Sequence, residues 1–290
     1  MNISDLLLRY GLRPNKRLGQ SFLVDEAALQ RVVEAANIQP DEVVLEIGPG
    51  LGHLTRVLAI KARRVVAVEL DEKLMTPLKE VLAHCSNVQL VQGDILKLNP
   101  AELMKDNQTR QMQSYLVVAN IPYYITSALI RHLLETGHPP QRLILTVQRE
   151  VAERICAKPG DMSLLSLSVQ VYGRPEIITC INASAFYPPP KVESAVVRVV
   201  LYPHPVIPGF LLSSFFRLAK AGFSHKRKTL RNALAGGMHW TPQQAETLLS
   251  AAGIDGMRRA QTLNLEEWGI LTEIIQSSSA EHLENPHQNP

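Results

Sequence analysis

The stretch EVVLEIGPGLGHLTRVLAIKARRVVAVELD, residues 42–71, decides the fold of this chain. Two short β-branched runs, 42–48 and 64–70, flank a glycine-rich turn and a segment with helical spacing. Short apolar runs bounded by turn residues predict buried strands, and the segment between them predicts a connecting helix. A strand, a helix and a second strand in this order favour a right-handed crossover between parallel neighbours.

The same alternation extends over residues 25–150. Further strand-like runs are NVQLVQGD (87–94), YLVVAN (115–120) and RLILTVQ (142–148). Helical stretches are DEAALQRVVEAA (25–36), with Asp25 as its expected cap, EKLMTPLKEVLAHC (72–85) and SALIRHLLET (127–136). This order predicts an α/β fold, with a doubly wound, Rossmann-like parallel sheet between two layers of helices.

After residue 160 the pattern changes. SLLSLSVQVYG (163–173) and residues 176–202 read as strands joined through Gly173-Arg174-Pro175, which predicts an antiparallel hairpin at the edge of the sheet. From residue 207 the spacing is helical, and the polar end is typical of disorder. We therefore predict a basic N-terminal arm at 1–24, a sheet domain at 25–206, a smaller all-helical domain at 207–276 and a disordered tail at 277–290.

Three strand ends carry groups that suit an adenosine ligand, because ligands of open parallel sheets bind beyond the carboxyl ends of the strands. The bare backbone at Gly48 and Gly50 permits close approach. His53 stands where a dinucleotide-binding loop needs glycine, so a nucleoside without pyrophosphate fits better. The Glu69 carboxylate can accept hydrogen bonds from ribose hydroxyls, and the Asp94 carboxylate can accept a hydrogen bond from an adenine amine. Each feature alone is ordinary, but together they predict S-adenosylmethionine as the cofactor.

The fourth strand ends in Asn120-Ile121-Pro122-Tyr123. An exocyclic aromatic amine is a poor nucleophile, since its lone pair is delocalised into the ring. The Asn120 side-chain oxygen and the Ile121 carbonyl can accept hydrogen bonds from both amine N–H groups, which favours a more nucleophilic nitrogen. Pro122 holds that carbonyl in an extended backbone, and Tyr123 can stack on the base. The competing interpretation is an ordinary proline turn with Tyr123 in the core.

Composition narrows the class of protein further. The net charge is only +3, but six cations and no acid lie within RLAKAGFSHKRKTLR (217–231), and a second basic group lies at 9–17. Such clusters indicate a polyanionic partner, although a solvated helix face is the simpler alternative. The three cysteines form no CxxC pair and suit a reducing cytoplasm, and no metal site is predicted. No apolar run approaches the roughly 18 residues of a membrane span, and no secretory signal is expected.

Seven segments of the sequence together resemble a known family. The segments that carry the resemblance are LGQSFLVD, EIGPGLGHLT, VELD, GDIL, NIPYYI, FYPPPKVESAVVR and HKRKTLRNAL. Together, over residues 13–270, they are similar to the ribosomal RNA adenine N6,N6-dimethyltransferases, and closest to the small-subunit branch. The resemblance implies dimethylation of two adjacent adenines in the terminal hairpin of small-subunit rRNA, in the cytoplasm, by a protein we expect to be monomeric.

The resemblance also implies roles for particular residues. Cofactor contacts are expected at Ser21, Leu23, Gly48, Glu69, Asp94 and Asn120, and the glycine loop itself adds Gly50. Contacts to the target base are expected at Asn120, Ile121, Pro122, Tyr123 and a second stacking aromatic, Phe186. The basic clusters, rather than the resemblance, predict RNA contacts at Arg17, Lys220, Lys226, Arg227, Lys228 and Arg231. Ser21 departs from the family, which usually has asparagine there, so its contact is expected to be weaker or mediated by water.

Four alternative functions compete with this interpretation. The large-subunit methylases of the erythromycin-resistance type share the catalytic motif, but the HKRKTLRNAL segment favours the small-subunit branch. Relatives that act as transcription or assembly factors would be expected to have lost Glu69, Asp94 or Asn120, all present here. A nicotinamide dehydrogenase does not fit His53. A protein-amide methylase is disfavoured, because a protein substrate does not explain the basic helical domain.

Overall fold

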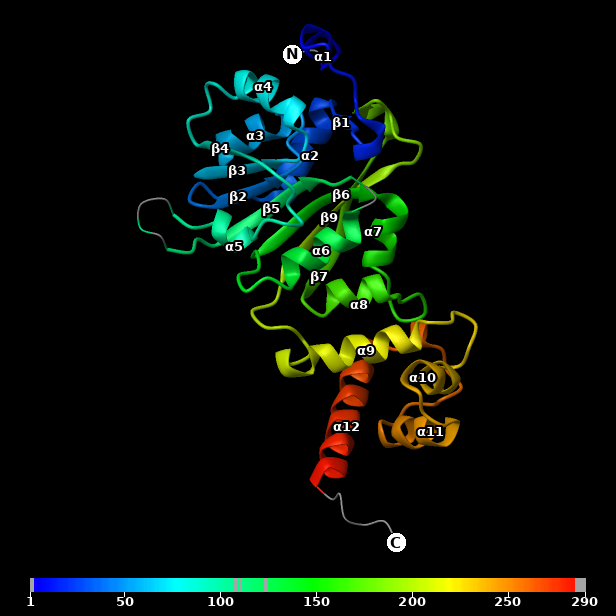
Figure 1. Cartoon of the computed structure of the whole chain (residues 1–290). Helices are drawn as coiled ribbons and strands as arrows, with labels where there is room; N and C mark the ends of the chain where they lie inside the picture. The colour runs from blue at the N-terminus through cyan, green and yellow to red at the C-terminus, as the bar shows by residue number, and fades with distance from the viewer. Residues whose placement is uncertain (1–2, 107–108, 110, 123–124, 285–290) are drawn as a thin grey trace. The chain divides into compact units, whose positions relative to one another are not determined.

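A computed structural model describes residues 3–106, 109, 111–122 and 125–284 of the chain. The chain divides into two compact units (Figure 1). The first unit comprises residues 1–153 and 174–201, and the second comprises residues 154–173 and 202–290. The sequence pattern predicts the boundary between the sheet domain and the helical domain at 206/207. Instead the excursion at 154–173 belongs with the C-terminal helices, because its apolar residues Met162, Leu167 and Val171 lie in their core.

A seven-stranded sheet in the order β4-β3-β2-β5-β6-β9-β7 forms the centre of the first unit. Its parallel strands are β2 (Val43–Ile47), β3 (Arg64–Glu69), β4 (Val88–Gln92), β5 (Tyr115–Asn120) and β6 (Arg142–Gln148). At the other end, β9 (Ser194–Leu201) pairs antiparallel with β6, and β7 (Gly173–Ile181) is the edge strand. The order of the strands reverses between β2 and β5, which is where a doubly wound sheet binds its ligand.

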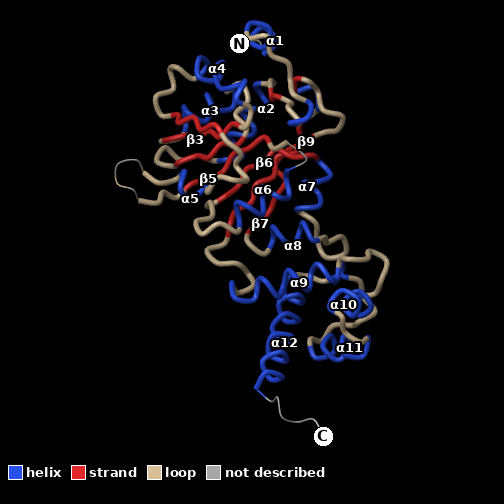
Figure 2. The backbone as a smooth tube through the Cα atoms, in the orientation of Figure 1, coloured by secondary structure: helices blue, strands red, loops and turns tan. Residues whose placement is uncertain are grey.

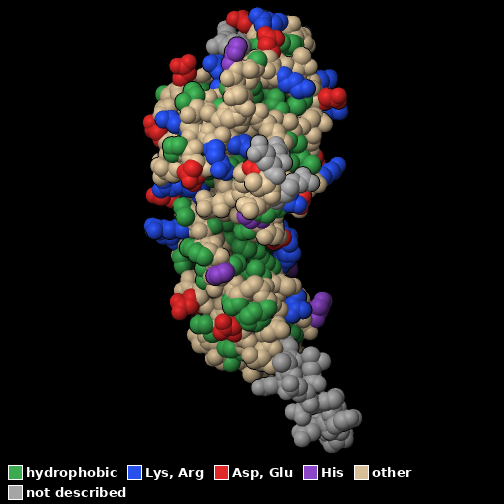
Figure 3. Space-filling model, turned by 90° about the vertical axis from the view of Figure 1, so that its left-hand side faces the viewer, with side chains coloured by type: hydrophobic (Ala, Val, Ile, Leu, Met, Phe, Trp, Pro, Cys, Tyr) green, Lys and Arg blue, Asp and Glu red, His purple; other side chains and the backbone are tan. Residues whose placement is uncertain are grey.

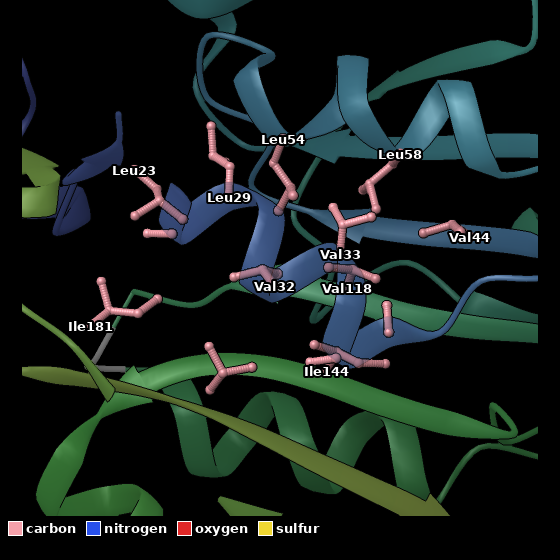
Figure 4. Close-up of a cluster of buried hydrophobic side chains, with 14 of the residues drawn as sticks. Leu23, Leu29, Val32, Val33, Val44, Leu54, Leu58, Val118, Ile144 and Ile181 are labelled. Carbon is pink, nitrogen blue, oxygen red and sulfur yellow. The ribbon is translucent and has the colours of Figure 1, made fainter. Parts of the chain in front are cut away.

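Helices connect the parallel strands, as the alternating pattern predicts. The connecting helices are α3 (His53–Lys61), α4 (Glu72–Val81), α5 (Pro100–Leu103) and α6 (Thr126–Leu134). Helix α2 (Glu26–Ala36) precedes β2, and α7 (Arg149–Ile155) follows β6. The predicted cap of α2 is confirmed, since the Asp25 carboxylate accepts a 2.7 Å bond from the Ala28 N–H. In Figure 4 apolar side chains of α2 and α3 converge with those of the strands, for example Val33 with Val118 and Ile144.

The N-terminal arm contains a helix, α1 (Ile3–Arg9), a 3-10 turn, η1 (Lys16–Leu18), and a short strand, β1 (Phe22–Leu23). Ile3, Leu6 and Leu7 of α1 form a buried cluster with Phe22, Leu51 and Leu74. The strand β1 pairs antiparallel with β8 (Phe186–Tyr187), in a two-stranded sheet separate from the main one. The arm is therefore packed onto the sheet domain.

Two predictions for the region after residue 160 are wrong. Residues 164–170 form a helix, α8 (Leu164–Gln170), and not a strand, because Ser163 and Ser166 make a reciprocal capping box at its start. Gly173-Arg174-Pro175 is not a hairpin turn, since these residues open β7. The link from β7 to β9 runs instead through a 3-10 turn, η3 (Ala183–Ala185), then β8 and residues 188–193.

The second unit is helical across the described residues 202–284, with no strand among them (Figure 2). Besides α8 its elements are η4 (Gly209–Leu211), α9 (Leu212–Gly222), α10 (Leu230–Met238), α11 (Pro242–Ala251), η5 (Ala260–Thr262) and α12 (Leu265–Glu284). Trp268, Phe215 and Leu218 are fully buried at its centre. Helix α12 continues to Glu284, where we had predicted a disordered tail from 277. None of the described helices has the length and apolar character of a membrane span.

Candidate cofactor and adenine site

A pocket lies at the carboxyl ends of β2, β3 and β5, beside the reversal in strand order. It gathers nine of the residues that the sequence predicts, from segments far apart in the chain. These are Ser21, Gly48, Gly50, Glu69, Asp94, Asn120, Ile121, Pro122 and Phe186. The predicted groups therefore share one cavity, as the geometry of an open parallel sheet requires.

The glycine loop after β2 needs its glycines for two reasons. Gly48 and Gly50 have φ angles of +72° and +58°, which residues with a side chain rarely adopt. A Cβ atom on Gly50 would also lie 2.8 Å from the ring of Phe22, which packs directly on the loop. The arm and the loop can therefore close on one another only because residue 50 has no side chain.

Glu69, at the end of β3, is a buried carboxylate that holds the loop in place. Its Oε2 accepts from the Gly50 N–H at 3.0 Å, and its Oε1 accepts from the Asp71 N–H at 2.8 Å. Burial raises the pKa of the Glu69 carboxyl, and these two backbone donors offset part of that shift. A carboxylate has about four acceptor positions, so the two hydrogen bonds to Gly50 and Asp71 do not use its full capacity and a ligand hydroxyl can also bind.

Asp94, two residues after β4, is half-buried at the pocket wall between Gly93 and Ile95. Its Oδ1 accepts from the Leu96 N–H at 3.0 Å, which fixes the orientation of the carboxylate. Its Oδ2 lies 3.9 Å from the exposed Lys97 ammonium, which is beyond ordinary hydrogen-bond distance. One oxygen of Asp94 is thus available to accept from an amine in the pocket.

Asn120 is the last residue of β5, and its side chain is held in one orientation. The Asn120 Nδ2 donates to the Ser21 carbonyl at 3.0 Å. Next to it, Ile121 is buried and its N–H donates to the Thr146 carbonyl at 3.1 Å, while the Pro122 carbonyl accepts from the Ile125 N–H. Tyr123, the predicted stacking residue, lies outside the described residues. The strand end therefore presents a fixed amide and a braced backbone to the pocket.

Phe186 lies in the pocket wall, buried, on β8 opposite Leu23 of β1. Leu23 is not among the residues that line this pocket, because its side chain is buried in the core beneath α2. The Ser21 hydroxyl donates to the Pro188 carbonyl at 2.7 Å. Two of the predicted cofactor contacts, Ser21 and Leu23, thus have side chains engaged with the protein.

Sequence reasoning missed several residues at this site. Gln20 lines the pocket and its amide donates to the Asp71 carboxylate at 2.8 Å, and Phe22 covers the glycine loop. Both lie within the LGQSFLVD segment, and the resemblance of that segment to the family could have indicated them. Glu46 was also missed, although it is the only charged residue of β2.

Glu46 lines a small cavity behind the glycine loop. Its side chain is 1% exposed, and its Oε2 has no hydrogen-bond partner among the described residues. Burial raises the pKa of the Glu46 carboxyl to about 8, so the group is protonated at neutral pH. A neutral carboxyl is the form that the interior of the sheet can tolerate.

The cations expected to meet RNA lie in different settings. Arg17 is exposed on the arm, Lys220 is exposed on α9, and residues 226–228 are exposed in the turn between α9 and α10. Arg231 instead lies 3.6 Å from the Glu246 carboxylate, so its charge is partly neutralised within the second unit. On the face drawn in Figure 3, cations and anions are interspersed over the first unit.

Comparison with known proteins places this geometry in a family. The sequence profile described as "Ribosomal RNA adenine dimethylase" matches residues 11–276. The chain is 45% identical over 267 residues to the ribosomal RNA small subunit methyltransferase A of Dehalococcoides mccartyi strain 195, covering 92% of this chain and 90% of that one. It is 41% identical over 270 residues to the Alkaliphilus metalliredigens protein of the same name, covering 92% and 93%.

Solved structures agree. The 23S rRNA methyltransferase ErmE aligns with a TM-score of 0.68 and 29% identity, covering 88% of this chain and 99% of that one. A dimethyladenosine transferase from Plasmodium falciparum aligns with a TM-score of 0.75 and 24% identity, covering 89% and 98%, which supports the fold. This chain therefore belongs to the ribosomal RNA adenine dimethylase family, enzymes that transfer methyl groups from S-adenosylmethionine.

Proposed function

We propose that this protein dimethylates the N6 amines of two adjacent adenines in the 3′-terminal hairpin of small-subunit rRNA, during assembly of the subunit in the cytoplasm. The observation that carries the proposal is the fixed amide of Asn120, which shares a pocket with the carboxylates of Glu69 and Asp94. The relatives named for small-subunit rRNA methylation, at 38–45% identity, support the choice of substrate.

The pocket residues fit the cofactor. Glu69 would accept from the ribose hydroxyls, and Asp94 would accept from the adenine amine. Gly48 and Gly50 offer bare backbone, and no cation that could neutralise a pyrophosphate is among the described lining residues. When bound, S-adenosylmethionine supplies an electrophilic methyl group on a sulfonium.

The protein's part in methyl transfer is to position the target amine. The Asn120 Oδ1 and the Ile121 carbonyl would accept hydrogen bonds from the N–H groups of the amine, of which two are present in the first transfer and one in the second. Each transfer releases one amine proton to water. Phe186 forms a wall of the pocket on which the base can rest. Glu69 and Asp94 are the only titratable groups among the described lining residues, and both are assigned to the cofactor. Catalysis in this proposal therefore depends on orientation and hydrogen bonding, and no general base is assigned among these described residues.

The second unit supplies the affinity for RNA in this proposal. The exposed cations at 220 and 226–228 would contact phosphates, which set position and affinity without reading bases. Arg17 on the arm would add a contact beside the pocket. In this proposal the protein acts as a monomer and recognises the folded small subunit by its shape.

Primer extension on ribosomal RNA tests the proposal. Unmodified small subunits would be incubated with the protein and S-adenosylmethionine, since a dimethylated adenine cannot pair and stops reverse transcriptase. We expect a stop at the adenine of the pair that lies nearer the 3′ end, and two N6,N6-dimethyladenosines per small subunit in digests. The similarity to ErmE gives the alternative, and stops on large-subunit rRNA alone would favour it.

A further inference from the structure

Ser21 makes two hydrogen bonds that join distant parts of the chain. Its carbonyl accepts from the Asn120 Nδ2 at 3.0 Å, and its hydroxyl donates to the Pro188 carbonyl at 2.7 Å. These partners lie 99 and 167 residues away in sequence. Ser21 therefore connects the end of β5, the N-terminal arm and the turn that follows Phe186.

The first bond determines which way the Asn120 amide faces. A carbonyl oxygen can only accept, so the Asn120 NH₂ group must lie toward Ser21. The Asn120 Oδ1 then lies on the opposite side of the amide, where it can accept from a donor. A flipped amide would set two oxygens against each other at the Ser21 contact and leave the NH₂ group to meet the substrate amine.

The second bond keeps the Ser21 carbonyl in place. The next arm residues are already tied to the same turn, because Phe22 and Leu23 pair with Tyr187 and Phe186. The Ala185 carbonyl also accepts from the Val24 and Asp25 N–H groups. Ser21 lies just before this paired stretch, and its hydroxyl extends the attachment by one residue to the point where Asn120 binds.

We propose that Ser21 is a positioning residue for the methyl-transfer step, holding its own carbonyl, and through it the Asn120 amide, against the turn at Pro188. This inference rests on the proposed function of the pocket. It differs from the expectation that Ser21 is a ligand of the cofactor, because the hydroxyl proton is already donated within the protein.

The two roles predict different effects of Ser21→Ala, which removes the hydroxyl alone. A positioning residue affects the rate of the chemical step, whereas a cofactor ligand affects binding. We expect the single-turnover methylation rate at saturating substrates to fall about three- to tenfold, the usual effect of losing one hydrogen bond. Affinity for S-adenosylhomocysteine should stay within about twofold.

Three further variants sharpen the test. Ser21→Thr keeps a hydroxyl and should restore most of the rate. Ser21→Cys, a weak donor of similar size, replaces Ser21→Ala should that variant fail to fold. Ser168→Ala is the matched control, because the Ser168 hydroxyl also donates to a backbone carbonyl, that of Leu165, at 2.8 Å on α8. It should leave both rate and affinity unchanged.

An NMR measurement reads the same bond without any activity. The side-chain amide signals of Asn120 should move in Ser21→Ala, because their acceptor is no longer fixed. Weakened cofactor affinity with an unchanged saturated rate would overturn the inference, as would unchanged rate and affinity. The two failures can be told apart. If the wild-type protein methylates no rRNA, the proposed function is wrong. If the Asn120 amide signals do not move in Ser21→Ala, Ser21 does not position that amide, whatever the activity of the protein.

Discussion

Replacing Glu69 with alanine should weaken cofactor binding and loosen the glycine loop together. In the folded protein this carboxylate accepts from the backbone N–H groups of Gly50 and Asp71, and Glu69 lines the pocket. The substitution removes a charged acceptor for the ribose hydroxyls. It also leaves the Gly50 N–H, in the buried loop, without its partner.

The magnitudes follow from these contacts. A hydrogen bond to a charged group contributes about 1.5–3 kcal/mol, so loss of the ribose contact should raise the Kd about ten- to a hundredfold. The loss of stability should be smaller than the loss of two backbone hydrogen bonds would give. Burial raises the pKa of Glu69, which shows that the buried charge is itself unfavourable, and the substitution removes that cost too. We expect the free energy of unfolding to fall by about 1–3 kcal/mol.

Calorimetric titration with S-adenosylhomocysteine and urea unfolding measure the two effects. Glu72→Ala is the control, since it removes an exposed carboxylate three residues further along. In wild type, affinity should fall on acidification at a higher pH than an ordinary glutamate would give, because protonation of Glu69 removes acceptor capacity. An unchanged Kd in folded Glu69→Ala would show that the ribose does not bind there.

Three further outcomes are expected. Asn120→Ala should lower single-turnover methylation by about one to two orders of magnitude with a smaller loss of RNA affinity, and a rate within about twofold of wild type would refute its role. Replacing Lys226, Arg227 and Lys228 together with alanine should weaken binding to small subunits and reduce its salt slope by about 2–3 in a filter-binding titration, with cofactor affinity unchanged. If these residues merely solvate a turn, the slope will not change. The raised pKa of Glu46, about 8, means that only the unfolded state ionises between the ordinary value of 4.5 and 8, so wild-type stability falls as pH rises through this window. Glu46→Gln should therefore gain up to about 1.4 kcal/mol per pH unit relative to wild type between about pH 5.5 and 7.5 in urea unfolding, and equal pH slopes for the two proteins would contradict it.

Local patterns predicted the parts of the fold that local physics determines. The β-branched runs, the glycine loop and the Asp25 cap are each encoded within a few residues, and β2 to β6 form as expected. Residues 163–170 were misread because serine and leucine nearly alternate there, which resembles a strand. The capping box of Ser163 and Ser166 favours a helix, and the apolar side chains of α8 join the core of the second unit.

The candidate site shows the same division. Strand ends could be placed together from topology alone, so Glu69, Asp94 and Asn120 were predicted in one pocket. The partners of Ser21 and Arg231 could not, because a hydrogen bond to Pro188 spans 167 residues and the ion pair with Glu246 joins two different helices. Such contacts depend on the packed backbone, and no spacing in the sequence indicates them.

The division into two units has a consequence for how the chain is synthesised. The chain leaves the first unit after residue 153, returns at 174 and leaves again after 201. During translation β6 therefore waits with an open edge until its partner β9 has emerged, and α8 waits for the helices after 201. A fragment cut at residue 206 would leave the apolar side chains of α8 without cover. Each unit is thus built from two separate segments of the chain, and neither corresponds to a continuous piece of the gene.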